Sequence, residues 1–142
     1  MKESVVHMHL DLPKENVGKV AQKPRILLVD DDPLFLAEIK RLAKANQFDV
    51  IDYSSVKEIY WNLSENHFDV GIIDYGLGMV TGVQLARFLE RSIPKFPMIL
   101  VSAKERIEKS DGWPRCIEDA VSKSVGPHEI LSIALKLTRK SP

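Results

Sequence analysis

Short runs of consecutive apolar residues recur along the chain, separated by segments whose apolar residues follow helical spacing. Such continuous runs are typical of strands that are buried on both faces of a sheet. We expect strands at 26–29, 48–53, 70–73 and 98–101, and a weaker one at 120–122.

The segments between these runs carry helix signals. Pro33 suits the first turn of a helix, because its missing N–H has no partner there in any case. Ser55 and Glu58 have capping-box spacing, which predicts a short helix through Leu63. A third helix is expected before the breaks at Pro94 and Pro97, and a last one from about Pro127. The positions with helical spacing in these helices are Leu34, Phe35, Ile39, Leu42, Val83, Leu85, Ala86, Leu89, Ile130, Ile133, Ala134 and Leu137.

Strand and helix alternate along nearly the whole chain, which favours a parallel sheet with helices on both faces. The polar segment 103–114 is the exception, and at most a short helix is expected there. In open sheets of this class, ligands bind beyond the carboxyl ends of the strands. The residues at those ends are Asp30, Asp31, Asp74, Ser102 and Lys123.

These five residues form a coherent set for handling phosphate. Three carboxylates repel one another unless a hard cation neutralises them, and oxygen ligands with room for water suit Mg²⁺. A carboxylate beside such an ion can attack phosphorus and form an acyl phosphate. Lys123 offers positive charge and the Ser102 hydroxyl offers a donor to the transferring group.

The sequence also resembles the receiver domains of bacterial response regulators, from about residue 25 to residue 140. Each matching motif is weak alone, but four occur in order at expected strand ends. They are Ile26–Pro33, Phe68–Asp74 with the later Gly82, Ile99–Ala103 and Val121–Lys123. The resemblance implies a doubly wound five-stranded parallel sheet with the flavodoxin-like strand order 2-1-3-4-5 and helices on both faces.

The resemblance also implies a role for each site residue. Asp74 would be the phosphate acceptor. Asp31 would ligate Mg²⁺ directly, Asp30 mainly through water, and the backbone carbonyl of Gly76 would be a further ligand. Ser102 would hydrogen-bond the phosphoryl group and Lys123 would form an ion pair with it. Asp32 is expected to start the following helix rather than bind the ion.

Several positions depart from the family pattern. Gly78 replaces a usual proline, Thr81 a frequent acidic residue, and Ser124 the proline that usually follows the lysine. Ala120 replaces the aromatic residue that moves when typical receivers switch. The segment 104–116 is also atypical, so a short or irregular fourth helix is expected. These changes leave the reaction centre intact and alter the surface that signals its state.

Composition adds limits to this interpretation. Lys and Arg balance Asp and Glu at 20 each, and Cys116 is the single cysteine. The zero net charge gives no general attraction to nucleic acid or to a membrane, and neither is expected as a partner. No membrane span or secretory signal is visible, so a cytoplasmic protein is expected. Residues 1–23 are expected to be an N-terminal extension, extended or partner-binding, and residues 24–142 the receiver domain.

Three functions remain open at this point. The first is a phosphorylation switch that takes its phosphoryl group from a sensor histidine kinase or phosphotransfer protein and acts through an unidentified downstream protein. It would be a monomer or a phosphorylation-dependent dimer, without multiple turnover and without an output domain after Lys140. The second is a receiver-like binding module that no longer switches, suggested by Ala120. The third is a magnesium-dependent phosphatase, because Asp30 and Asp32 have Asp-x-Asp spacing.

Purely structural roles also remain open for individual residues. Asp30 and Asp31 have the placement of helix-start residues, and Lys123 that of a surface lysine. The aromatic residues Tyr60, Trp61 and Trp113 are expected to be partly packed rather than to form a binding surface.

Overall fold

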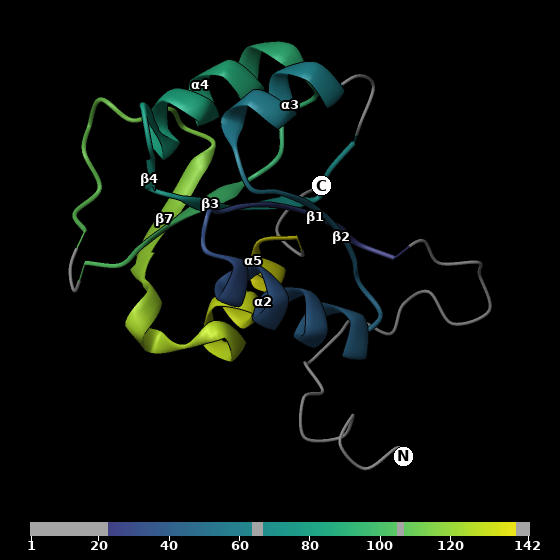
Figure 1. Cartoon of the computed structure of the whole chain (residues 1–142). Helices are drawn as coiled ribbons and strands as arrows, with labels where there is room; N and C mark the ends of the chain where they lie inside the picture. Colours follow the sequence, from purple (N-terminus) through teal and green to yellow (C-terminus); the bar gives the residue numbers. More distant parts are fainter. Residues whose placement is uncertain (1–22, 64–66, 105–106, 139–142) are drawn as a thin grey trace.

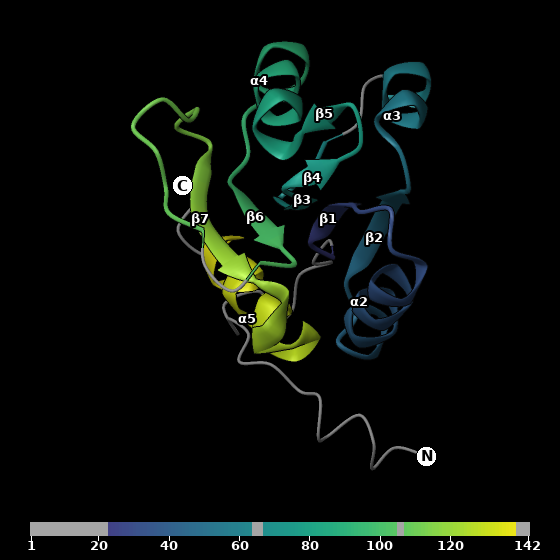
Figure 2. The same ribbon diagram turned by 60° about the vertical axis from the view of Figure 1, so that its left-hand side comes forward.

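The computed structural model describes residues 23–63, 67–104 and 107–138, and its centre is a parallel sheet (Figures 1 and 2). The sheet has five strands in the order β2-β1-β3-β6-β7, which confirms the expected topology. The bounds are Arg25–Val29 for β1, Asp49–Tyr53 for β2, Val70–Asp74 for β3, Met98–Ser102 for β6 and Ile117–Ser122 for β7. The expected extension at 1–23 lies, except for Lys23, outside the described residues.

Helices cover both faces of the sheet. Helices α2 (Pro33–Ala45) and α5 (Pro127–Thr138) lie on one face, and α3 (Val56–Asn62) and α4 (Gly82–Ser92) on the other (Figure 1). Each face has its own apolar core, and strands β1, β3 and β6 contribute to both. Burial on both faces explains why these strands read as continuous apolar runs. Within the described residues, no helix combines the length and apolar character needed to cross a membrane.

Side-chain caps set the starts of three helices. Asp32 is the N-cap of α2, where its carboxylate accepts a hydrogen bond from the Leu34 amide at 3.0 Å. Ser55 caps α3, as its capping-box spacing predicts. Thr81 and Gln84 form a reciprocal capping box at α4, which the sequence analysis did not identify. These caps satisfy amide groups that have no partner inside the helix.

Two connections differ from expectation. A small hairpin, β4 (Gly76–Leu77) with β5 (Val80–Thr81), follows β3 where only a loop was expected. The expected fourth helix is wrong for residues 107–116, which contain no helix. Turns occupy the centre of this segment near Gly112, and Pro114 follows shortly after, so a helix has no uninterrupted stretch in which to form.

Strand β7 is longer than expected and begins at Ile117. Its pairing with β6 shifts after the first pair, since Met98 faces Ile117 but Ile99 faces Asp119. Glu118 is therefore an extra residue, as in a β-bulge. The Asp119 carboxylate accepts a hydrogen bond from the Ala120 amide at 2.8 Å. After β7 the chain forms a short 3₁₀ turn, Lys123–Val125, which leads into α5.

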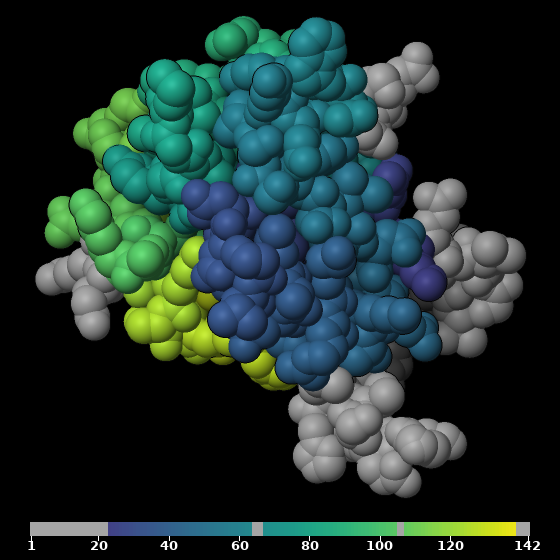
Figure 3. All heavy atoms as spheres, in the orientation of Figure 1, coloured from purple at the N-terminus to yellow at the C-terminus, as the bar shows by residue number. Residues whose placement is uncertain are grey.

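Two expectations about burial are wrong. Leu34 was expected on the apolar side of α2 but is 74% exposed, because it lies on the outward face of the helix, in line with the exposed residues Ala37 and Glu38. Trp61 was expected to pack but is 79% exposed on α3, a helix that forms part of the near surface in Figure 3. Tyr60 is half-exposed, and its ring contacts Phe88 on α4 edge-on at 4.6 Å between centroids.

Candidate functional site

Three carboxylates converge at the carboxyl end of the sheet. One oxygen each from Asp30, Asp31 and Asp74 lies within 4.8 Å of the others. Asp30 and Asp74 are buried, whereas Asp31 is exposed and opens the cluster to solvent. The sequence predicted all three as site residues, and the structure brings them together.

The topology of the sheet produces this convergence. Strands β1 and β3 are parallel neighbours, and Val29 pairs with Ile73 near their ends. The next residues along the two strands are Asp30 and Asp74, so their side chains leave the sheet at the same level. Asp31 follows before Asp32 begins α2. The Asp32 carboxylate is used as the helix cap and is not among the three clustered acids.

Lys123 reaches the cluster from the end of β7. Its ammonium nitrogen lies 2.8 Å from Oδ2 of Asp30, and its side chain is only 20% exposed. The nitrogen also lies 4.7 Å from the centre of the Phe35 ring on α2, in a cation–π contact. Lys123 is therefore not a free surface lysine. Phe35 is a contact that sequence reasoning missed, since its spacing identified it only as a core residue.

Burial and charge shift the ionisation of the cluster. Burial, together with the charge of Asp30, raises the pKa of Asp74 to about 6, although Lys123 opposes the shift. Burial also raises the pKa of Asp30. Burial alone lowers the pKa of Lys123, but its contact with Asp30 and the charge of that carboxylate raise it by more. Crowded carboxylates with raised pKa values are typical of a site that takes a cation or a proton.

The donor set fits Mg²⁺. All three clustered groups are carboxylates, the hard oxygen ligands that this ion prefers. The exposure of Asp31 leaves room for the water molecules that Mg²⁺ keeps when it binds to proteins. No nitrogen or sulfur ligand lies among the three, which makes zinc a poorer match.

Ser102 ends the neighbouring strand β6 and is buried. It follows Val101, the partner of Asp74 in the β3–β6 pairing. Its hydroxyl oxygen accepts a hydrogen bond from the Lys104 amide at 3.0 Å. A hydroxyl has one proton of its own to donate, so Ser102 can still act as a donor toward a group on the cluster.

Two glycines lie beside Asp74 with different surroundings. The Gly76 amide hydrogen-bonds the Asp74 carboxylate and lowers its pKa, while the carbonyl of Gly76 as a metal ligand stays a prediction. Gly82 starts α4, and a Cβ there would collide with the Asp74 carbonyl oxygen and lie 2.9 Å from Leu100 Cδ2. Gly82 therefore lets α4 approach the end of β3. The resemblance to the receiver family identified Gly82 as a shared glycine but did not explain why a glycine is needed there.

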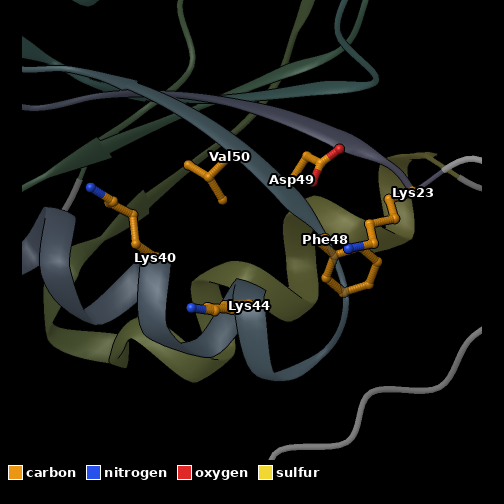
Figure 4. Close-up of a pocket in the computed structure, with 6 residues that line it drawn as sticks. All are labelled: Lys23, Lys40, Lys44, Phe48, Asp49 and Val50. Atoms are coloured by element: carbon orange, nitrogen blue, oxygen red, sulfur yellow. The ribbon is translucent and has the colours of Figure 1, made fainter.

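A separate pocket of about 310 Å³ lies between α2 and β2, at the opposite end of the sheet (Figure 4). Its lining is mixed in charge, since the Asp49 carboxylate lies among the lysines and Lys40 is paired with Asp52 at 3.4 Å. None of the predicted site residues contributes to it. The lining residues are Lys23, Lys40, Lys44, Phe48, Asp49 and Val50.

Comparison with known proteins agrees with this geometry. The family model for the response regulator receiver domain matches residues 26–135, so the chain belongs to that family. Receiver domains are signalling modules of two-component systems. The heme response regulator HssR of Staphylococcus saprophyticus is 25% identical over 112 residues, covering 78% of this chain and 48% of that protein. The chain spans about half the length of the first curated relatives it matches.

Solved structures share the fold. A CheY-like receiver domain protein from Methanospirillum hungatei superposes with a TM-score of 0.73 at 21% identity, covering 84% of this chain and 96% of that one. The response regulator TrrA from Thermotoga maritima, solved in complex with Mg²⁺ and BeF, gives a TM-score of 0.68 at 22% identity, covering 80% and 98%.

Proposed function

We propose that this protein is a phosphoacceptor switch of a two-component system and that Asp74 receives the phosphoryl group. One observation carries the proposal: Asp30, Asp31 and Asp74 converge within 4.8 Å, and Lys123 is held against Asp30. Carboxylates, a fixed cation and a hydroxyl at one end of a sheet are the groups that phosphoryl transfer to an acid requires. Membership of the receiver family supports the same function.

The proposed step is transfer from a phosphohistidine to Asp74. An oxygen of the Asp74 carboxylate attacks phosphorus while the phosphorus–nitrogen bond breaks. The electron pair of that bond leaves with the imidazole nitrogen, which then takes up a proton. The product is an acyl phosphate on Asp74 and a free histidine on the donor. With a pKa of about 6, Asp74 is mostly ionised at neutral pH, as a nucleophile must be.

The other residues stabilise the charge that the transfer brings. Asp30, Asp31 and Asp74 would hold Mg²⁺, with the Gly76 carbonyl as a further ligand. The ion would neutralise charge on the phosphoryl oxygens. Lys123 would form an ion pair with one phosphoryl oxygen, and its contact with Phe35 keeps the ammonium group facing the site. The Ser102 hydroxyl would donate a hydrogen bond to a second phosphoryl oxygen.

The proposed partners follow from this chemistry. A sensor histidine kinase or a phosphotransfer protein would supply the phosphoryl group, and a downstream protein would read the phosphorylated form through protein contacts. The chain would accept and slowly lose its own phosphoryl group rather than turn over a substrate. The structure of TrrA in complex with Mg²⁺ and BeF supports Mg²⁺ as the ion, because that protein has the same fold and holds Mg²⁺.

Labelling with acetyl phosphate and Mg²⁺ tests this function. We expect the mass of one phosphoryl group to be added to the intact protein and peptide mapping to find it on Asp74. Asp74→Asn should abolish the label, as should removal of Mg²⁺ with EDTA. Asp52→Asn is the matched control, since Asp52 lies on β2 and pairs with Lys40 outside the cluster. A label on another residue, or undiminished labelling of the Asp74 variant, would exclude the proposal.

The second candidate is a binding module that keeps the acidic cluster but does not switch. It is favoured by Ala120, which stands in place of a movable aromatic ring. The two functions differ in one measurement. A switch changes its surface when Asp74 is labelled, so hydrogen exchange of backbone amides outside the site should differ between the two forms. Complete labelling with identical exchange outside the cluster would favour the module.

A further inference from the structure

The end of β7 has no aromatic side chain to report the state of Asp74. Ala120 is partly buried and pairs with Leu100 on β6. Its methyl group has no rotamer to change. A signal that leaves this site must therefore pass through other residues near Asp74.

Tyr75 is the residue nearest to Asp74 along the chain that carries an aromatic ring. Its amide donates to the Val101 carbonyl at 2.8 Å, and its carbonyl accepts from the Gly82 amide at 2.7 Å. These bonds fix its backbone to β6 and to the start of α4. The ring is half-buried, and its centroid lies 6.4 Å from the Trp113 ring, with an angle of 40° between the planes. Such a tilted contact is favourable between aromatic rings.

Trp113 belongs to the segment 107–116, which runs beside α4 to the start of β7 (Figures 1 and 2). Besides the ring contact, hydrogen bonds tie the segment to the neighbouring elements. The Arg87 guanidinium on α4 donates to the Gly112 carbonyl. The Met98 amide donates to the Cys116 carbonyl at 2.7 Å, where the segment joins β7. Trp113 is half-buried and packs on the outside of the core of this face, so a change in its packing alters the edge of the core and not its centre.

We propose that the Tyr75–Trp113 pair transmits the state of Asp74 to the segment 107–116. This inference rests on the proposed function. A phosphoryl group on Asp74 adds charge one residue from Tyr75, and the new contacts of that group displace the end of β3. The Tyr75 ring follows its backbone, Trp113 follows the ring, and the segment presents a different surface. The pair thus replaces the movable aromatic ring that Ala120 lacks.

The composition of the segment suits a readout surface. Glu108, Lys109, Asp111 and Arg115 are all exposed and carry both signs of charge. A shift of Trp113 changes the relative positions of these charges without exposing apolar surface. A downstream protein that recognises this mixed pattern would bind one state of the segment better than the other.

Tryptophan fluorescence tests the proposal directly, because the chain has only two tryptophans, Trp61 and Trp113. Trp61 is 79% exposed, so Trp61→Phe should leave the fold unchanged and make Trp113 the sole emitter. Mg²⁺ with beryllofluoride serves as the phosphoryl mimic. We expect a shift in the Trp113 emission maximum beyond that caused by Mg²⁺ alone, and no such shift when Asp74→Asn is added.

Two further variants in the Trp61→Phe background separate coupling from general damage. Tyr75→Leu should remove the shift while acetyl phosphate still labels Asp74. Tyr60→Leu is the matched control, since Tyr60 contacts Phe88 and not Trp113, and it should keep the shift. Normal labelling with unchanged Trp113 emission in the otherwise native protein would overturn the readout and leave the phosphoacceptor function standing. Failure of labelling itself would instead overturn the proposed function.

Discussion

The ammonium nitrogen of Lys123 lies 2.8 Å from Oδ2 of Asp30, although β3 and β6 separate their strands in the sheet. The lysine spans two strand positions to reach a fully buried carboxylate. In the metal-free protein it therefore partly neutralises the acidic cluster. It also competes with any cation for the same group.

This competition predicts opposite effects of Lys123→Met on two properties. Mg²⁺ should bind about tenfold more tightly, because removing a positive charge from a partly buried site is worth more than 1 kcal/mol. Labelling of Asp74 by acetyl phosphate at saturating Mg²⁺ should be slower, because the phosphoryl oxygens lose their ion-pair partner. Titration calorimetry and labelling rates measure the two effects. Lys95→Met, at the other end of the sheet, should change neither, and weaker Mg²⁺ binding by the Lys123 variant would contradict the competition.

The raised pKa of Asp74 predicts that Asp74→Asn stabilises the protein when no metal is present. The fold favours the protonated carboxyl, so this contribution is complete below the ordinary pKa near 4 and is lost as the pH rises through about 6. At pH 7.5 in EDTA the free energy of unfolding of the variant should exceed that of the parent by about 3 kcal/mol, and at pH 3.5 the two should be nearly equal. Urea unfolding at the two pH values measures this. Equal stability of the variant and the parent at pH 7.5 would contradict this prediction.

Asp31 is the exposed member of the cluster, so its contribution to ion binding can be separated from folding. Asp31→Asn should weaken Mg²⁺ binding about tenfold, roughly 1.4 kcal/mol, by removing one charge from the ligand set. Its unfolding free energy in EDTA should stay within about 0.5 kcal/mol of the parent, as for other surface substitutions. Calorimetric titration and urea unfolding of the same preparation decide the matter. Unchanged Mg²⁺ affinity would remove Asp31 from the ligand set.

The close approach of α4 to β3 predicts a steric effect at Gly82. Gly82→Ala should destabilise the protein by about 1–3 kcal/mol, because its Cβ meets the Asp74 carbonyl and a Leu100 methyl group. It should also slow labelling, since the shift needed to relieve the clash moves the end of β3. Gly76→Ala is the matched control, with no atom within 4 Å of the added carbon. Equal stability of the two variants would show that the helix can retreat freely.

Cys116 provides a chemical test of how the segment 107–116 is held. Burial, with the charge of Glu90, raises the pKa of this thiol to about 11. The thiolate is the reactive form, so iodoacetamide at pH 8 should modify Cys116 much more slowly in the folded protein than in urea. Equal rates in both conditions would mean that the segment does not cover the thiol.

The sequence predicted most of the sheet and the reaction centre for a common physical reason. Strands buried on both faces leave unbroken apolar runs, and the residue after each run necessarily lies at the carboxyl end of the sheet. Position at the end of a strand was therefore enough to assign Asp30, Asp74 and Lys123 to the site. Their final positions depend on side chains, and the long reach of Lys123 to Asp30 has no signal in the spacing.

What sequence reasoning missed depends on contacts between distant segments. The irregular segment 107–116 is held by Arg87 and Tyr75, which are remote in the chain and carry no local pattern. Leu34 was assigned to the apolar side of α2, yet it lies on the outward face while its neighbour Phe35 is buried in the core. Where apolar residues are consecutive in a helix, periodicity alone does not decide which of them faces the core.

The displaced register at the start of β7 has a consequence for association between molecules. An outermost strand with regular backbone groups is a template on which a further strand can add. Here the extra residue Glu118 interrupts that template, the Asp119 carboxylate occupies the Ala120 amide, and both acids are exposed. A second chain that approached this edge of the sheet would meet an irregular backbone and two negatively charged side chains. At high protein concentration, molecules should therefore not associate edge to edge through β7.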